Sequence, residues 1–209
     1  MPNYRRLRVP GATYFFTVNL AEDGDTALVE HIDLLREAYR VTAAEHPIDC
    51  RAMVILPDHI HAVWALPPGD ADFSRRWQKI KARFTHASGL RGARSRSMVE
   101  KREAGLWQRR FWEHLIRDSA EEARAIAYCL MDPVRHGYVK EASDWPFSTI
   151  HRDLRAKVGG SPTLRAVAYG GRFAHLPIVR DVTASRPAAP PGPPSTAPPS
   201  SPPRSQPLQ

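Results

Sequence analysis

Two apolar runs separated by only two residues constrain the fold of this chain more than any other feature. The first run extends from Ile48 to Leu56, Pro57-Asp58 follows as a turn, and the second run extends from His59 to Leu66. Both runs have the length and the apolar character of strands, and so short a connection leaves only an antiparallel partner within reach. The sequence therefore predicts a β-hairpin over 48–66, around which the other elements must be arranged.

Strand and helix patterns flank the hairpin on both sides. Residues 12–20 alternate as a strand, and a helix with apolar positions at helical spacing follows and runs to about His46. After the hairpin, apolar residues recur at helical spacing over 73–84, and 106–117 alternates again as a strand. This βαββαβ order predicts an α+β fold with a ferredoxin-like core, an antiparallel sheet whose two crossover helices cover one face.

A further helix follows this core. A capping box at 119–122 opens it, and Pro133 is expected to end it. Helical spacing puts Tyr128 and Asp132 on one face of this helix. If the helix covers the other face of the sheet, it brings Tyr128 against the strand that begins at His59.

Two histidines one residue apart begin the second arm of the hairpin. Because side chains alternate along a strand, His59 and His61 project from the same face. Two imidazoles on one face of a stiff element are able to share a metal ion. For an arbitrary His-x-His pair, however, hydrogen-bonded or hydrated residues at a strand edge are the commoner outcome, so the pair alone does not predict a metal site.

The composition predicts one domain and a tail. The chain has 209 residues, 42% of them hydrophobic, which is enough for one domain with a proper core. Residues 183–209 hold ten of the twenty prolines together with Ser, Ala and Gln. Such a segment cannot bury a core and is expected to be disordered. We therefore predict a domain at 1–150, a C-terminal extension at 151–182 and a proline-rich tail at 183–209.

The charge predicts a polyanionic partner. The formal net charge is +8, and the segment from Arg75 to Arg110 alone holds twelve Lys or Arg against two acidic residues. Within it, 89–105 has the pattern of a flexible basic loop. The chain has neither an apolar stretch long enough to cross a bilayer nor a signal peptide, so we expect a cytoplasmic protein without a membrane partner.

Nucleic acid is the polyanion that this pattern favours. Exposed aromatic residues, for which Trp77 and Trp107 are candidates, would stack unpaired bases. The candidate nucleic-acid-binding residues are Arg5, Arg6, Arg75, Arg76, Lys79, Arg83, Arg109 and Arg110. A solvated helix face beside a disordered loop is the simpler alternative for the same charges.

Four segments together resemble a known family. They are Pro57–His61, Trp107–His114, Tyr128–Gly137 and Trp145–Ser148. Each is modest alone, but in this order and at these separations they resemble the single-tyrosine HUH transposases, and most closely the REP-associated tyrosine transposases. The similarity covers roughly residues 4 to 150.

The resemblance implies a function and its residues. His59 and His61 would bind Mg or Mn, and Tyr128 would cut single-stranded DNA near palindromic, REP-like hairpins through a 5′ phosphotyrosine intermediate. Asp132 occupies a metal-site position that is usually Asn in this family and Gln in its mobile relatives. A carboxylate is a sound ligand for a hard cation, so Asp132 is a third candidate metal ligand.

Two other functions remain open at this point. A catalytically silent, hairpin-binding regulatory protein would keep the fold, and the unusual Asp132 motivates this alternative. A small zinc hydrolase that uses His59 and His61 is disfavoured, because the sequence has no third His or Cys at suitable spacing. The resemblance allows either a monomer or a homodimer.

Overall fold

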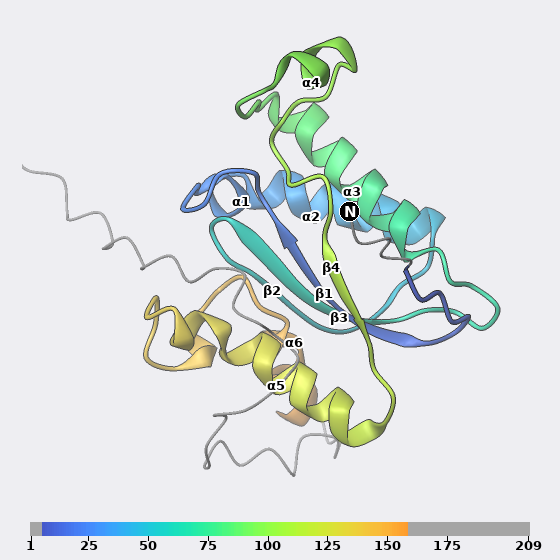
Figure 1. Cartoon of the computed structure of the whole chain (residues 1–209). Coiled ribbons are helices and arrows are strands. Elements are labelled where there is room, and N and C mark those ends of the chain that lie inside the picture. Colours follow the sequence, from blue (N-terminus) through green and yellow to red (C-terminus); the bar gives the residue numbers. More distant parts are fainter. Residues whose placement is uncertain (1–5, 159–209) are drawn as a thin grey trace, which may run out of the picture.

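The computed structural model describes residues 6–158. Their elements, in order, are β1 (Thr13–Asn19), α1 (Ala27–Glu30), α2 (Ile32–Glu45), β2 (Asp49–Ile55), β3 (His59–Ala65), α3 (Phe73–Ser88), α4 (Arg96–Glu100), β4 (Trp112–Leu115), α5 (Ser119–Arg135), the 3-10 helix η1 (Ala142–Asp144) and α6 (Ile150–Val158). The α+β, ferredoxin-like fold class is confirmed (Figure 1). None of the helices in this part of the chain is long and apolar enough to cross a membrane.

The four strands form one antiparallel sheet in the order β2-β3-β1-β4. β1 and β3 are its central strands, and their register pairs Thr17 with His61. Every residue of β3 is buried, because strands flank both of its edges and helices cover both faces of the sheet. The hairpin predicted at 48–66 is confirmed as β2 and β3.

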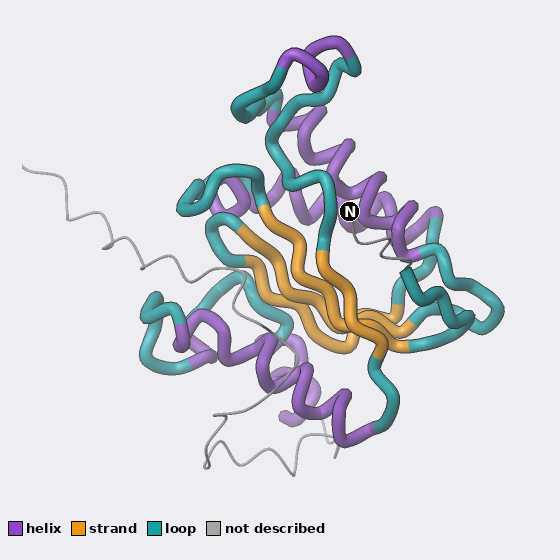
Figure 2. The backbone as a smooth tube through the Cα atoms, in the orientation of Figure 1, coloured by secondary structure: helices purple, strands orange, loops and turns teal. Residues whose placement is uncertain are grey.

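Helices cover the sheet on both faces, with α2 and α3 on one side and α5 on the other (Figures 1 and 2). The alternation of strand residues divides the interior into two cores. Trp64 belongs to the core under α2 and α3, where its indole stacks on Trp77 with ring centroids 4.2 Å apart. Val63 belongs to the core under α5. His59 and His61 share the strand parity of Val63, so they also face α5.

Helix α5 differs from the prediction at both ends. Its N-cap is Asp118 rather than Ser119, and the Asp118 side chain accepts the Glu121 N–H at 2.7 Å. At the other end the helix runs through Pro133 to Arg135, so the predicted end at Pro133 is wrong. A proline removes only its own N–H, and the backbone N–H groups that follow it find acceptors at 132 to 134. This additional turn shapes the functional site.

Helix α6 extends the folded body beyond the predicted domain boundary at 150. Arg152 donates to the carbonyl oxygens of Cys50 and Arg51, at 2.8 and 2.9 Å, and so attaches α6 to strand β2. The predicted extension at 151–182 therefore starts inside the fold. Its remainder and the predicted proline-rich tail lie outside the described residues.

Arg76, a predicted DNA contact, is only 1% exposed. Its guanidinium donates to both Asp70 carboxylate oxygens, at 2.7 and 3.2 Å, and twice to the Pro47 carbonyl, at 2.9 and 3.2 Å. These bonds tie α3 to the connection between α2 and β2, in which Pro47 lies. Because the guanidinium has no surface left for DNA, we reassign Arg76 to a structural role.

This anchoring role predicts a loss of stability. We expect Arg76→Ala to lower the free energy of unfolding by about 2–4 kcal/mol, because it leaves the Pro47 carbonyl and the Asp70 carboxylate without their donor. Arg75→Ala, at the exposed neighbouring position, is the control and should stay within about 0.5 kcal/mol. Urea denaturation measures both values, and an equally small change in the two variants would contradict the assignment.

Candidate metal centre and nucleophile

Strand β3 and helix α5 meet at the point where β3 begins and α5 ends. The strand carries His59 and His61, which are 8% and 4% exposed, and the helix carries Asp132, which is 1% exposed. Asp132 Oδ2 lies 3.2 Å from His59 Nε2 and 3.3 Å from His61 Nε2. The structure therefore brings together the three predicted metal-ligating residues around one carboxylate oxygen.

The additional turn of α5 completes this cluster. His136 Nε2 lies 3.6 Å from the same Asp132 oxygen, and the Arg135 guanidinium donates to the other oxygen, Oδ1, at 3.3 Å. Ligand atoms of His59, Asp132 and His136 all lie within 4.8 Å of one another, close enough to hold one metal ion. His61 faces the same oxygen, so the site offers three imidazoles and one carboxylate.

Each of the two β3 histidines has a polar partner at Nδ1, the ring nitrogen that faces away from Asp132. Asp58 Oδ1 lies 2.6 Å from His59 Nδ1, and the second Asp58 oxygen accepts the Gly24 N–H at 2.8 Å. A carboxylate only accepts, so it keeps the proton on Nδ1 and turns Nε2 toward the cluster. Thr17 Oγ1 lies 3.0 Å from His61 Nδ1. A hydroxyl both donates and accepts, so it accommodates either tautomer of His61.

The shared carboxylate sets the protonation of the cluster. Burial lowers the pKa of His59, but the hydrogen bonds to Asp132 and Asp58 outweigh it and raise that pKa to about 9. Burial lowers the pKa of His61. Burial also disfavours the Asp132 carboxylate, but the neighbouring imidazoles His61 and His59 outweigh it and hold the pKa of Asp132 far below its usual range. The raised pKa of His59 and the lowered pKa of Asp132 both favour an ion pair between these two side chains.

Tyr128 lies one helical turn before Asp132 and is half-buried. Its ring centroid is 5.5 Å from that of His61 and 5.7 Å from that of Phe15, both in edge-on geometry. The guanidinium carbon of Arg135 lies 4.1 Å from the centroid of the Tyr128 ring. The phenol therefore stands beside the histidine strand, where the predicted docking of the late helix puts it.

The candidate DNA-contacting cations on α3 do not form one surface. Lys79 and Arg83 both pair with Glu45 on α2, the former at 2.7 Å. Arg75 is exposed. Lys79 and Arg83 are thus engaged between the two helices, and of the α3 cations named in the prediction only Arg75 stays in our proposed DNA interface.

The remaining candidates lie at the segment before β4 or near the N-terminus. Arg6 stacks on Phe111, with its guanidinium carbon 4.0 Å from the ring centroid. Arg109 pairs with Glu103 at 2.6 Å, and Arg110 is exposed. Arg5 lies outside the described residues. Trp77 is 1% exposed, so it is a core residue and not a stacking platform, whereas Trp107 is half-buried.

Two members of the cluster were missed from the sequence. Asp58 was interpreted only as a turn residue, although it directly precedes His59. His136 lies beyond Pro133, where the helix was expected to end, so no site role was predicted for it. The usable signal was spacing: His136 follows Asp132 by four residues, one helical turn, once the helix is allowed to continue.

Comparison with known proteins places this geometry in a family. No protein-family model matches the chain. A REP-associated tyrosine transposase from Escherichia coli (strain K12) is 44% identical over 154 residues, which cover 74% of this chain and 86% of the relative. A solved REP-associated tyrosine transposase bound to a REP hairpin matches with a TM-score of 0.71 at 39% identity, over 85% of this chain and 96% of that chain. The resemblance carried by the four motifs is confirmed, and this chain belongs to the REP-associated tyrosine transposases.

Proposed function

We propose that this protein is a metal-dependent single-stranded DNA endonuclease and strand transferase with Tyr128 as its nucleophile. One observation supports this most directly: the Tyr128 ring lies 5.5 Å from the ring of His61, whose Nε2 faces the Asp132 oxygen shared with His59. A phenol beside convergent metal-ligating groups is the arrangement that cleavage of a phosphodiester by tyrosine requires. Membership of a transposase family agrees with this chemistry.

The proposed step is a transesterification. The phenolic oxygen of Tyr128 attacks the scissile phosphorus in line, an O–P bond to the 5′ phosphate forms, and the bond from phosphorus to the 3′ oxygen breaks. The phenol loses a proton and the departing 3′ oxygen gains one. Because the covalent link retains a phosphoester, a later 3′ hydroxyl is able to rejoin the strand without an external energy source. The Arg135 guanidinium lies over the phenol ring, with its carbon 4.1 Å from the ring centroid.

The donor set fits a divalent cation. We propose that His59, His61 and Asp132 hold it, with His136 within reach of the same site. A hard carboxylate suits Mg, and imidazoles also suit Mn, so one of these two ions is the proposed cofactor. Such an ion supplies Lewis-acid stabilisation of the charge that develops on the phosphate oxygens.

The proposed substrate is single-stranded DNA that carries a palindromic hairpin. The similar solved structure holds a REP hairpin. In this chain, the exposed Arg75 and Arg110 are available for phosphate contacts. We propose a cytoplasmic location because DNA is the substrate, and a monomer or homodimer as the acting form.

A catalytically silent hairpin-binding protein is the second candidate function. It is favoured by Asp132, a carboxylate where the family resemblance leads us to expect an amide, and one that two imidazoles and Arg135 already satisfy. The same assay separates the two candidates, because only the nuclease forms a covalent bond to DNA.

The nuclease proposal predicts a covalent adduct that depends on one oxygen. Labelled single strands with a hairpin, incubated with the protein and Mg or Mn, should give a protein–DNA adduct on a denaturing gel. Tyr128→Phe should abolish the adduct while DNA affinity changes by less than about twofold, because phosphate contacts dominate binding. His59→Ala should give the same result through the metal site. Binding without any adduct in the unaltered protein would favour the silent alternative.

The protonation of His59 predicts how metal affinity depends on pH. The pKa of His59 is raised to about 9, and an ion must displace this proton, so Mn affinity should rise about tenfold per pH unit below 9 and then level off. Calorimetric titration with Mn measures the profile. Asp58→Asn keeps an acceptor at His59 but removes the charge, so the levelling should move to lower pH. An affinity that is independent of pH would contradict the proposed ligand set.

A further inference from the structure

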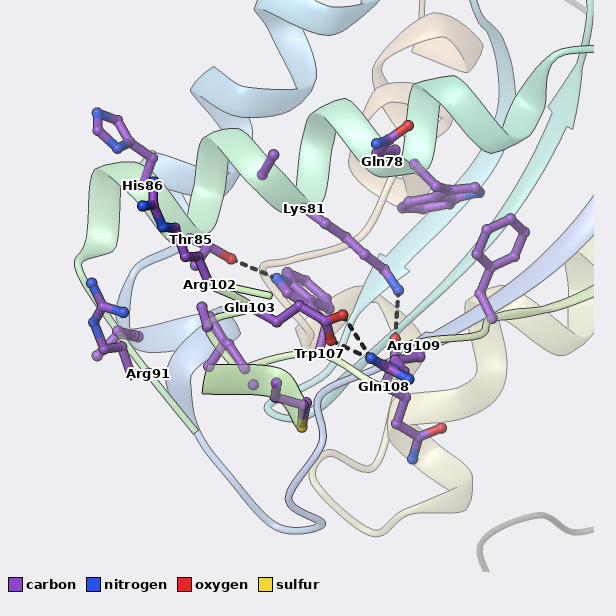
Figure 3. A pocket seen from close by; sticks show the side chains of 18 of the residues that line it. Gln78, Lys81, Thr85, His86, Arg91, Arg102, Glu103, Trp107, Gln108 and Arg109 are labelled. Carbon is purple, nitrogen blue, oxygen red and sulfur yellow. Dashed lines mark hydrogen bonds and ion pairs between the residues drawn. The ribbon is translucent and has the colours of Figure 1, made fainter. Parts of the chain in front are cut away.

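A pocket lies away from the metal centre, between α3 and the segment 89–111 (Figure 3). We call it the α3 pocket. It encloses about 710 Å³, within the range of cavities that bind small organic ligands. The core residue Trp77, which forms part of its lining, packs on the sheet face opposite to the one that carries His59 and His61. The pocket is therefore separate from the proposed site of cleavage.

The segment 89–111, which forms one wall of the pocket, has a defined backbone structure. This segment includes the region expected as a flexible loop, but it contains α4 and is closed by a backbone bond from Gly92 N–H to the Ala104 carbonyl at 3.0 Å. Gly105 has a φ of +74°, and a Cβ there would lie 2.6 Å from the Ala93 carbonyl oxygen. A Cβ at Gly92 would in turn collide with the Gly105 carbonyl. The wall therefore depends on two glycines in close backbone contact.

The lining of the pocket is strongly cationic. Five basic side chains contribute to it against one carboxylate. They are Arg6, Lys81, Arg91, Arg102 and Arg109, with Glu103 as the carboxylate. Glu103 pairs with Arg109 at 2.6 Å, and Arg6 pairs at 3.4 Å with Glu113, which is not part of the lining. Among the described residues, the other three cations of the lining have no carboxylate partner.

Lys81 is the partly buried member of this set that reaches across the pocket. Its ammonium group reaches from α3 across the pocket and donates to the Gln108 carbonyl at 3.1 Å (Figure 3). Within the described residues it has no carboxylate partner. Burial, together with the nearby Arg6 charge, lowers the pKa of Lys81 to about 8. A partly buried cation without a counter-ion is costly for the fold and creates an anion site.

Aromatic rings stand beside this ammonium group. The Lys81 nitrogen lies 5.4 Å from the centroid of the Trp107 ring and 5.7 Å from that of Phe111. The Trp107 indole N–H donates to Thr85 Oγ1 at 3.0 Å, which fixes the plane of that ring (Figure 3). A cation next to oriented aromatic rings is the pairing that binds a phosphate and the base attached to it.

We infer that the α3 pocket binds an unpaired nucleotide of the DNA, with a phosphate at Lys81 and the base against Trp107. The choice of DNA as ligand rests on the proposed function. The nucleotide must be unpaired, because a base enters a concave pocket of this size only when it is free of its partner strand. Recognition by stacking and by charge makes the pocket tolerant of base identity.

The test compares two lysines of the same helix. Binding of a short fluorescein-labelled oligothymidylate is measured by anisotropy with EDTA present, in a Tyr128→Phe background, so that cleavage plays no part. Lys81→Met should weaken binding about tenfold and make the salt dependence shallower. Lys79→Met, whose ammonium group pairs with Glu45 on the α2 side, should weaken it by less than about twofold. Arg91→Gln, at an exposed lining position, is a second variant and should weaken it about threefold.

Thermal unfolding separates ligand binding from a structural role. If Lys81 binds a DNA phosphate, Lys81→Met should leave the Tm of the DNA-free protein unchanged or raise it. The reason is that the substitution removes a partly buried cation that has no carboxylate partner among the described residues. A lower Tm together with unchanged oligothymidylate binding would overturn the inference.

Photo-crosslinking locates the nucleotide directly. A strand that carries iodouracil should crosslink to peptides with Trp107, and a strand with abasic sites should bind more weakly. Crosslinks confined to α5 and β3, or an acidic peptide that competes as well as DNA of equal charge, would overturn the inference. Because these measurements need neither metal nor Tyr128, the pocket and the cleavage chemistry can each fail without the other.

Discussion

The site depends on one buried carboxylate, that of Asp132. Asp132 is 1% exposed, and an unpaired charge at such a position would cost several kcal/mol. Its compensation comes from the imidazoles of His59 and His61 on β3 and from Arg135 on its own helix. The end of α5 is therefore held at the beginning of β3, and Tyr128, one turn earlier on the helix, is held beside His61. The contact that stabilises this junction is also the one that assembles the proposed catalytic groups.

The sheet separates two kinds of chemistry. Alternation along β3 directs His59 and His61 toward α5 and directs Trp64 toward α2 and α3. The candidate metal-ligating groups therefore lie on one face, and the cationic pocket lies beside the helices of the other. This arrangement agrees with the proposed nuclease, because the cations of the pocket do not crowd the proposed phosphoryl-transfer site.

Local patterns predicted the βαββαβ order, the hairpin and the shared face of His59 and His61, because backbone periodicity is a property of neighbouring residues. The same reasoning failed where distant groups decide. Pro133 is tolerated inside α5 because packing holds the turn around it, and that turn brings His136 to the cluster. Arg76 was grouped with the exposed cations of α3, although Asp70 and the Pro47 carbonyl hold it in the interior.

The sequence by itself determined the elements, their order and the four motifs that mark the family, since these depend on residue type and spacing. Only the tertiary structure decided which basic side chains are engaged in ion pairs and which are free to bind an anionic ligand. Periodicity cannot tell whether a basic side chain meets a carboxylate of another element. Arg83 pairs with Glu45, whereas Lys81 donates to the Gln108 carbonyl and has no carboxylate partner in the part of the chain that the structure describes. Nor can periodicity reveal that three imidazoles, two from β3 and one from the end of α5, face one oxygen of Asp132. Ion pairing and burial arise from groups far apart in the chain, so their outcome becomes readable only once the chain has folded.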